Sequence, residues 1–272
     1  MTLELFHNHM STCSQKVRLC LAEKRVTDWV SRHIDLGKNE HLEPAYLSIN
    51  PNGVVPAFRH DGSIIVESTV MCEYLDEVFG TIGELTPADP VARAHMRAWL
   101  RYIDEVPSMA VRVPTFRHWI RPKFLAMSEA EFDEYAERNP LRKPFLKRMG
   151  RAGFSDADYD VAIWQLRQSF ARMEKVLERA PWLCGSRFGI ADICMVPVLA
   201  RLEDLYLGEI AGEFGRVSDW YARAQARPSF ALAFYDGSRP RRAEDYTLFT
   251  GKAVPAHGSA AGSAANATPP SV

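Results

Sequence analysis

The sequence predicts a two-domain protein, in which a small mixed α/β domain over residues 1–80 precedes an all-α domain over residues 89–245. Within the first domain, β-branched runs alternate with helical patterns, whereas the chain after a glycine- and proline-containing linker at 81–88 follows helical spacing. The length of 272 residues also exceeds what one hydrophobic core usually organises.

The first domain should contain the order strand, helix, strand, long loop, two strands and helix. Apolar side chains recur with helical spacing after Ser14 and again after Ser68. Two β-branched runs are joined through Asp61-Gly62, a dipeptide typical of tight hairpin turns. This is the element order of thioredoxin-like folds, because the βαβ part gives a parallel strand pair and the hairpin an antiparallel one. Strands are expected at about 3–6, 29–34, 54–58 and 63–66, and helices at about 14–25 and from 68 onward.

The second domain shows helical spacing throughout. Pro107 and Pro114 should kink or divide its first, long helix, because proline lacks a backbone donor and clashes with the preceding turn. Residues 253–272 are mainly Ala, Gly, Ser, Pro and Asn, so we expect a disordered tail that cannot bury enough apolar surface to order. Helices are expected at about 89–124, 128–139, 156–180, 190–207 and 217–226.

Composition and charge narrow the class of protein. The 33 basic and 34 acidic residues leave a net charge of -1, which offers no general attraction to nucleic acid or anionic lipid. Neither a signal peptide nor a membrane-spanning apolar run is recognisable, so we expect a cytoplasmic protein without a membrane partner. The five cysteines form no CxxC pair and no His cluster has zinc-site spacing, so reduced thiols and no metal site are expected.

The segment Ser11-Thr12-Cys13-Ser14 stands between the first predicted strand and the first helix. The free backbone N–H groups and the dipole at a helix N-terminus stabilise anions. A hydroxyl donor placed there lowers the pKa of a thiol, because it favours the thiolate, which is the nucleophile of thiol chemistry. A simpler interpretation is that Ser11 and Ser14 only cap the helix.

Two further segments stand at strand ends on the same side of such a fold. A cis peptide bond at Val55-Pro56 would leave Val55 able to pair with the backbone of a bound peptide. Glu67 and Ser68 stand where the next strand meets a helix, a position suited to a carboxylate and an ammonium group. Each signal is common alone, but together with Ser11 they indicate a site for a short peptide such as glutathione.

These motifs resemble the glutathione transferase superfamily over roughly residues 3–240. The Ser-x-Cys-Ser order is similar to that of the zeta and theta-like classes. The resemblance implies a glutathione-binding thioredoxin-like domain, a helical domain that binds a hydrophobic substrate, and a homodimer. The segments that carry it are Ser11-Thr12-Cys13-Ser14 with Val17-Arg18, Asn50-Pro51, Val55-Pro56, and Glu67-Ser68 followed by Tyr74-Leu75.

The resemblance also implies roles for individual residues. Ser11 would hydrogen-bond the glutathione thiolate, and Val55 would pair with the cysteinyl backbone before a cis Pro56. Glu67 and Ser68 would hold the γ-glutamyl end, and His41 matches the position that holds the glycine end in theta-like classes. The candidate catalytic residues are therefore Ser11, Cys13 and Ser14, and the candidate glutathione-binding residues are His41, Val55, Pro56, Glu67 and Ser68.

Two positions depart from the family pattern. The segment Phe188 to Ile193 resembles the buried capping motif of the helical domain, but Gly189 replaces its usual hydroxyl residue, while Asp192 can still accept backbone N–H donors. Val54 stands where many relatives have Lys or Gln. The capping box is therefore expected to be incomplete, and one side-chain contact to glutathione is expected to be missing.

Within the superfamily, the chain resembles the glutathione-dependent β-etherases of lignin-degrading bacteria. The resemblance lies in residues 93–105 and in an extension over residues 127–154 that most transferases lack. It implies that the thiolate attacks the carbon bearing an aryl ether of a small hydrophobic aromatic substrate, releases a phenol and leaves a glutathione thioether.

Two alternatives stay open. Cys13 also resembles the cysteine of reductive dehalogenases and maleylacetoacetate isomerases of the same superfamily, where it forms a mixed disulfide with glutathione or assists isomerisation. The other alternative is a noncatalytic glutathione-binding protein, which some members of this fold are.

Overall fold

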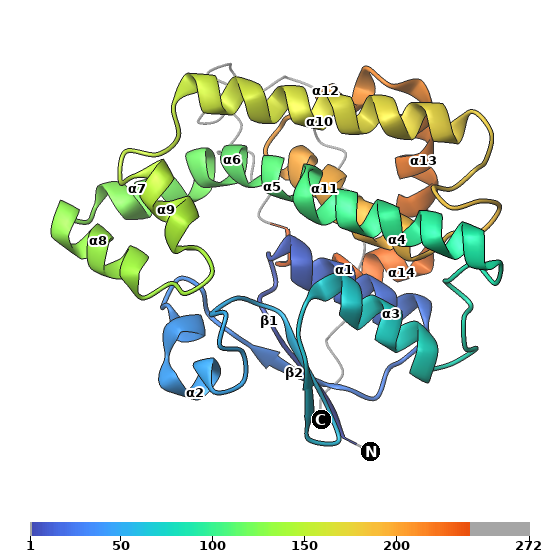
Figure 1. The fold of residues 1–272 in the computed structure, drawn as a ribbon, viewed down its shortest axis with the longest axis horizontal. Coiled ribbons are helices and arrows are strands. Elements are labelled where there is room, and N and C mark those ends of the chain that lie inside the picture. Colours follow the sequence, from blue (N-terminus) through green and yellow to red (C-terminus); the bar gives the residue numbers. More distant parts are fainter. Residues whose placement is uncertain (1, 240–272) are drawn as a thin grey trace.

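A small mixed sheet with the strand order β2-β1-β3-β4 forms the base of the molecule (Figure 1). It is seen in a computed structural model that describes residues 2–239; the predicted tail at 253–272 and the predicted end of the helical domain at 245 lie outside them. β1 pairs in parallel with β2, and β3 pairs antiparallel with β4, as predicted; β1 also pairs antiparallel with β3. The strands are β1 (Leu3–His7), β2 (Val30–His33), β3 (Ala57–His60) and β4 (Ser63–Ile65).

Side-chain alternation and one turn explain how the strands are arranged in the sheet. Leu3 and Leu5 alternate with Phe6, so the first two join the main core and Phe6 packs on the opposite face. Asp61 and Gly62 both have positive φ, 45° and 86°, which is the conformation that a two-residue hairpin turn of type I′ requires. The third strand begins at Ala57 rather than at Val54, so the expected boundary was wrong by three residues.

Helices α1 and α3 cover one face of the sheet and separate it from the helical part of the chain, while the short α2 lies on the other side (Figure 1). Ser68 is the first residue of α3, and Glu67 precedes it as a cap without a side-chain hydrogen bond. The helices up to the linker are α1 (Thr12–Glu23), a 3-10 turn η1 (Glu40–Leu42), α2 (Pro44–Leu47) and α3 (Ser68–Val78).

The remaining described chain is helical, which confirms the predicted fold class. The long first helix divides at Pro107 as predicted, but Pro114 lies inside a short helix. Short helices that begin at or next to prolines, such as α9 and α14, were missed because they are too short for a periodic signal. These helices are α4 (Pro90–Glu105), α5 (Pro107–Ala110), α6 (Arg112–Thr115), η2 (Phe116–Ile120, a π-helical turn), α7 (Arg121–Leu125), α8 (Glu129–Glu137), α9 (Lys143–Met149), α10 (Asp156–Leu177), α11 (Ile190–Asp204), α12 (Glu209–Gly212), α13 (Gly215–Gln225) and α14 (Pro228–Ala233).

The segment from η2 to α9 forms a lobe with its own apolar core, and we call residues 116–154 the helical extension. Phe124 and Phe132 are buried at its centre. In Figure 1 it projects beside α10, on the same side of the molecule as α2. No helix among residues 2–239 is long and apolar enough to cross a membrane.

The surroundings of the capping motif of α11 explain why it departs from the family pattern. The Asp192 carboxylate accepts hydrogen bonds from the Gly189 N–H at 3.1 Å, the Leu183 N–H at 3.0 Å and the Trp220 indole at 2.7 Å. A Cβ at position 189 would lie 2.7 Å from the Leu85 carbonyl oxygen. The linker therefore passes too close for a serine or threonine, and only half of the capping box remains.

Burial raises the pKa of Asp192 from 3.8 to about 6, although its hydrogen bonds oppose the shift. The folded state therefore binds the proton more tightly than the unfolded state, so the stability contributed by this group is present below about pH 4 and is lost as pH rises to about 6. Relative to Asp192→Asn, which does not titrate, the wild type should lose about 3 kcal/mol over this window. Urea unfolding of both proteins at several pH values measures the difference. If the free energy of unfolding changed with pH in the same way for both, the raised pKa of Asp192 would be contradicted.

Candidate active site at the start of helix α1

Ser11 is the cap of α1, and its hydroxyl oxygen accepts a hydrogen bond from the Ser14 backbone N–H at 3.3 Å. The Ser11 O–H donates to no residue within 2–239. Cys13 follows in the first turn and is partly buried. Ser14 is fully buried, and its hydroxyl accepts from the Asn8 N–H at 3.3 Å. Ser11 therefore caps the helix and still has a proton to donate, whereas Ser14 supports the preceding loop.

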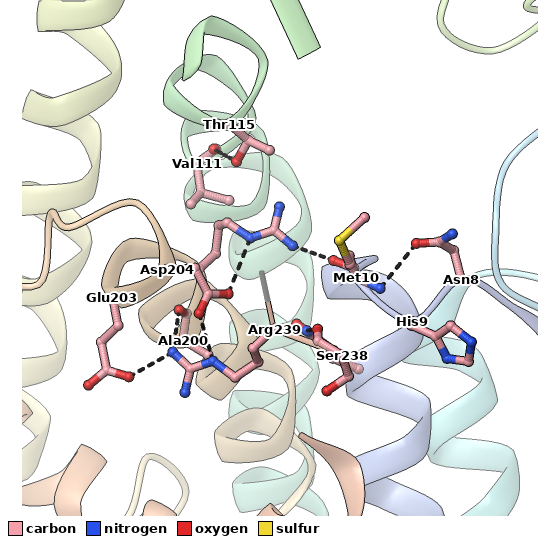
Figure 2. Close-up of polar contacts among 12 residues, drawn as sticks. Asn8, His9, Met10, Val111, Thr115, Ala200, Glu203, Asp204, Ser238 and Arg239 are labelled. Atoms are coloured by element: carbon pink, nitrogen blue, oxygen red, sulfur yellow. Dashed lines mark hydrogen bonds and ion pairs between the residues drawn. The ribbon is translucent and has the colours of Figure 1, made fainter. Parts of the chain in front are cut away.

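The helical part of the chain holds the loop that leads to Ser11. The Met10 N–H donates to the Asn8 side-chain oxygen at 3.0 Å (Figure 2), and the Ser11 N–H donates to the Asn8 carbonyl at 3.2 Å. From α11, the Arg201 guanidinium donates to the Met10 carbonyl. The position of Ser11 is thus fixed from both domains.

Arg201 is in turn held by a buried charge cluster. Its Nε lies 3.8 Å from the Asp204 carboxylate, which accepts from Arg239 at 2.7 Å, and its guanidinium lies 4.5 Å from the centre of the Trp119 ring. Figure 2 shows Arg239 between Asp204 and Glu203. Burial lowers the pKa of Arg201 to about 10, which still leaves it charged at neutral pH. This cluster could not be predicted from the sequence, because Arg201 and Met10 are 191 residues apart.

The Val55–Pro56 peptide bond is cis, as predicted. The Val54 carbonyl before it accepts from the Tyr46 hydroxyl and from the Asn50 side chain, both at 2.7 Å. Val55 itself makes no backbone hydrogen bond with another described residue. Its peptide groups therefore remain available to pair with a bound peptide.

Glu67 has a backbone φ of 69°, which is uncommon for a residue other than glycine. Its side chain is exposed and forms no ion pair with another residue of 2–239, while Ser68 is buried at 8% exposure. Such strained positions persist where the surroundings fix them and often occur at functional sites.

His41 lies on η1 and is 5% exposed. Its Nδ1 has no hydrogen-bond partner among the described residues. Burial lowers the pKa of His41 to about 4, with the positive charges of Arg142 and Lys123 adding to the effect. The imidazole is therefore neutral at pH 7 and can hydrogen-bond a carboxylate but cannot form an ion pair with it.

The strand register brings these segments to one edge of the sheet. Phe6 pairs with Ala57, so Pro56 stands at the end of β1 from which the chain runs to Ser11. His7 pairs with His33 at the parallel end of β2, from which the chain continues to η1. The carboxyl ends of β1 and β2, the cis proline and the loop to His41 therefore share this edge.

Comparison with known proteins identifies the family. Residues 10–78 match the model of the glutathione S-transferase N-terminal domain, and residues 156–223 match that of the C-terminal domain. The protein LigF of Sphingobium sp. (strain NBRC 103272 / SYK-6) is 32% identical over 246 residues, which cover 88% of this chain and 95% of LigF. The chain belongs to the glutathione S-transferase family.

One further relative is similar in sequence, and one solved structure is similar in fold. The tetrachloro-p-hydroquinone reductive dehalogenase of Sphingobium chlorophenolicum is 28% identical over 243 residues, covering 85% of this chain and 95% of the relative. The crystal structure of beta-etherase LigF superposes with a TM-score of 0.75 at 31% identity, covering 86% of this chain and 99% of that one. Glutathione is the co-substrate of this family.

Proposed function

We propose that this glutathione S-transferase is a glutathione-dependent β-etherase. The observation that carries the proposal is the Ser11 hydroxyl. Its oxygen caps α1, while its O–H group donates to no described residue and can donate to a ligand. It lies at the same sheet edge as the cis Val55–Pro56 bond. The similarity to beta-etherase LigF over most of both chains supports the reaction type.

The proposed reaction is a substitution at the carbon that carries the aryl ether. The Ser11 O–H donates to the glutathione sulfur, which keeps it as the thiolate beside the positive end of α1. The sulfur forms a C–S bond as the C–O bond breaks, the ether electrons leave on a phenoxide, and solvent supplies its proton. The products are a phenol and a glutathione thioether.

The remaining site residues are proposed to hold glutathione. The free peptide groups of Val55 pair with the cysteinyl backbone, and the exposed Glu67 with Ser68 binds the γ-glutamyl end. His41 hydrogen-bonds the glycine end as a neutral imidazole. Ser14 acts indirectly, because its hydroxyl accepts from the Asn8 N–H in the loop that leads to Ser11.

Incubation with glutathione and a panel of β-aryl ether model compounds, followed by mass spectrometry, tests the function. We expect equimolar phenol and glutathione thioether from at least one compound. Glutathione binding without any thioether, across aryl ethers, halogenated aromatics and a generic electrophile, would instead support a noncatalytic glutathione-binding protein.

A second candidate function is supported by Cys13, which is partly buried in the first turn of α1, and by the similarity to the reductive dehalogenase. The Cys13→Ser change separates the two. If the protein is an etherase, phenol release should change by less than about threefold, because Ser11 supplies the needed donor. If it is a dehalogenase, Cys13→Ser should accumulate a glutathionyl adduct of a halogenated substrate, which intact-mass analysis of the products detects.

The homodimer is also proposed on the family resemblance, and the cytoplasmic location on the lack of a membrane-spanning apolar run in the sequence. Light scattering after gel filtration tests the first, and fractionation of the native cells tests the second. A monomer at micromolar concentration would contradict the proposed dimer.

A further inference from the structure

The helical extension lies against the loop that carries His41. The Lys123 ammonium of α7 donates to the Asn39 side-chain oxygen at 2.8 Å and to the Gly37 carbonyl at 3.2 Å. Both acceptors precede η1, so the extension holds the segment that leads into His41.

Two further contacts involve residues that follow His41 in the sequence. The Arg138 guanidinium lies 3.6 Å from the Glu43 carboxylate. Pro140 packs so closely that a Cβ on Gly53 would come within 3.1 Å of its Cδ. The turn between α8 and α9 therefore covers the glycine end of the proposed glutathione site.

Arg142 stands in this turn and precedes the first residue of α9. Its side chain is partly buried, and its guanidinium makes no hydrogen bond or ion pair with another residue in the described part of the chain. Burial, with the nearby charge of Arg112, lowers the pKa of Arg142 to about 10, so it stays protonated at neutral pH. A partly desolvated cation without a counterion is costly.

The groups around Arg142 show where this charge acts. The turn that carries Arg142 contacts Glu43 directly after η1. From this turn, the charge of Arg142 contributes to the lowered pKa of His41 and interacts with Cys13 at the start of α1. Lys123 adds a second positive charge beside His41. The surroundings therefore favour an anion between α1 and His41.

We propose that Arg142 binds the carboxylate at the glycine end of glutathione, so that the helical extension completes the glutathione site. This inference rests on the proposed function. The guanidinium can bind a carboxylate through two parallel hydrogen bonds, which the neutral His41 cannot match. The other glutathione carboxylate lies at the γ-glutamyl end, which is assigned to Glu67 and Ser68 at the start of α3.

Calorimetric titration with glutathione and with its glycyl ethyl ester tests the inference, because the ester lacks only this carboxylate. Arg142→Gln should weaken glutathione binding roughly tenfold, the effect of a lost charge-assisted hydrogen bond. The wild type should bind the ester about as weakly as Arg142→Gln binds glutathione, and Arg142→Gln should weaken ester binding by less than about twofold.

Arg138→Gln is the matched control, since Arg138 lies in the same turn but contacts Glu43 at the surface, and its effect should stay below about threefold. Arg142→Lys should recover part of the affinity. If Arg142→Gln weakened the binding of glutathione and of its ester equally, the inference would be overturned. So would unchanged glutathione affinity with a turnover loss confined to carboxylated aromatic ethers, which would place a substrate carboxylate on Arg142. Absence of glutathione binding by the wild type would overturn the proposed function itself.

Discussion

Ser11→Ala should lower the rate of thioether formation roughly 100-fold at neutral pH, the usual cost of removing a hydrogen-bond donor from a reacting anion. Without this donor the pKa of the bound glutathione thiol rises, so less thiolate is present at pH 7. The rate should therefore recover partly as pH increases. The measurements are a pH–rate profile for phenol release and the ultraviolet absorbance of bound thiolate.

The capping role of Ser11 needs a separate control, because its hydroxyl oxygen accepts from the Ser14 N–H. Loss of a cap through alanine costs about 1 kcal/mol of stability, but through glycine only a few tenths. If Ser11 acts on the thiolate, Ser11→Gly should lose as much activity as Ser11→Ala while remaining more stable. Near wild-type activity of Ser11→Gly would show that the residue is only a cap.

Lys24→Met should destabilise the protein by about 3–5 kcal/mol, the cost of leaving one member of a buried ion pair without its partner. The Lys24 ammonium lies 2.8 Å from the Asp76 carboxylate, and both side chains are 0% exposed. It also donates to the Thr81 carbonyl, so this pair ties α1 to α3 and to the start of the linker. Urea unfolding monitored by circular dichroism measures the loss.

A second substitution distinguishes charge from packing at this pair. Asp76 also accepts from the Leu85 N–H at 3.0 Å, a contact that asparagine can keep. Lys24→Met combined with Asp76→Asn should therefore recover at least half of the lost stability, because no uncompensated charge remains. A double variant no more stable than Lys24→Met would show that packing around the lysine stem is responsible.

Much of the fold could be predicted because its signals are local. The Asp61-Gly62 turn fixes the hairpin, since its positive φ angles suit few other residues. Helical spacing located α1, α10 and α11, whose ends differ by only a few residues from the expected ones. Short helices such as α9 escaped, because four to seven residues are too few to show a period.

The candidate site was predicted from motifs that act through their place at strand and helix ends. Ser11, the cis bond before Pro56 and the start of α3 need only the order of elements to be located. Gly189 was noted as a departure, but its reason was not predictable, since the approach of Leu85 follows from the path of a linker about one hundred residues earlier in the chain.

The sequence alone thus determined the class of fold, the position of Ser11 at the start of α1 and the family, because backbone preferences and periodic burial act over a few residues. Only the tertiary structure decided which partners the charged side chains meet: Arg201 the Met10 carbonyl, Lys24 the Asp76 carboxylate, and Arg142 no acidic partner among the residues described. The physical reason is that electrostatic interactions depend on distance in space. Lys24 and Asp76, 52 positions apart, meet only when the first domain folds, and Met10 and Arg201, 191 positions apart, meet only when the two domains pack.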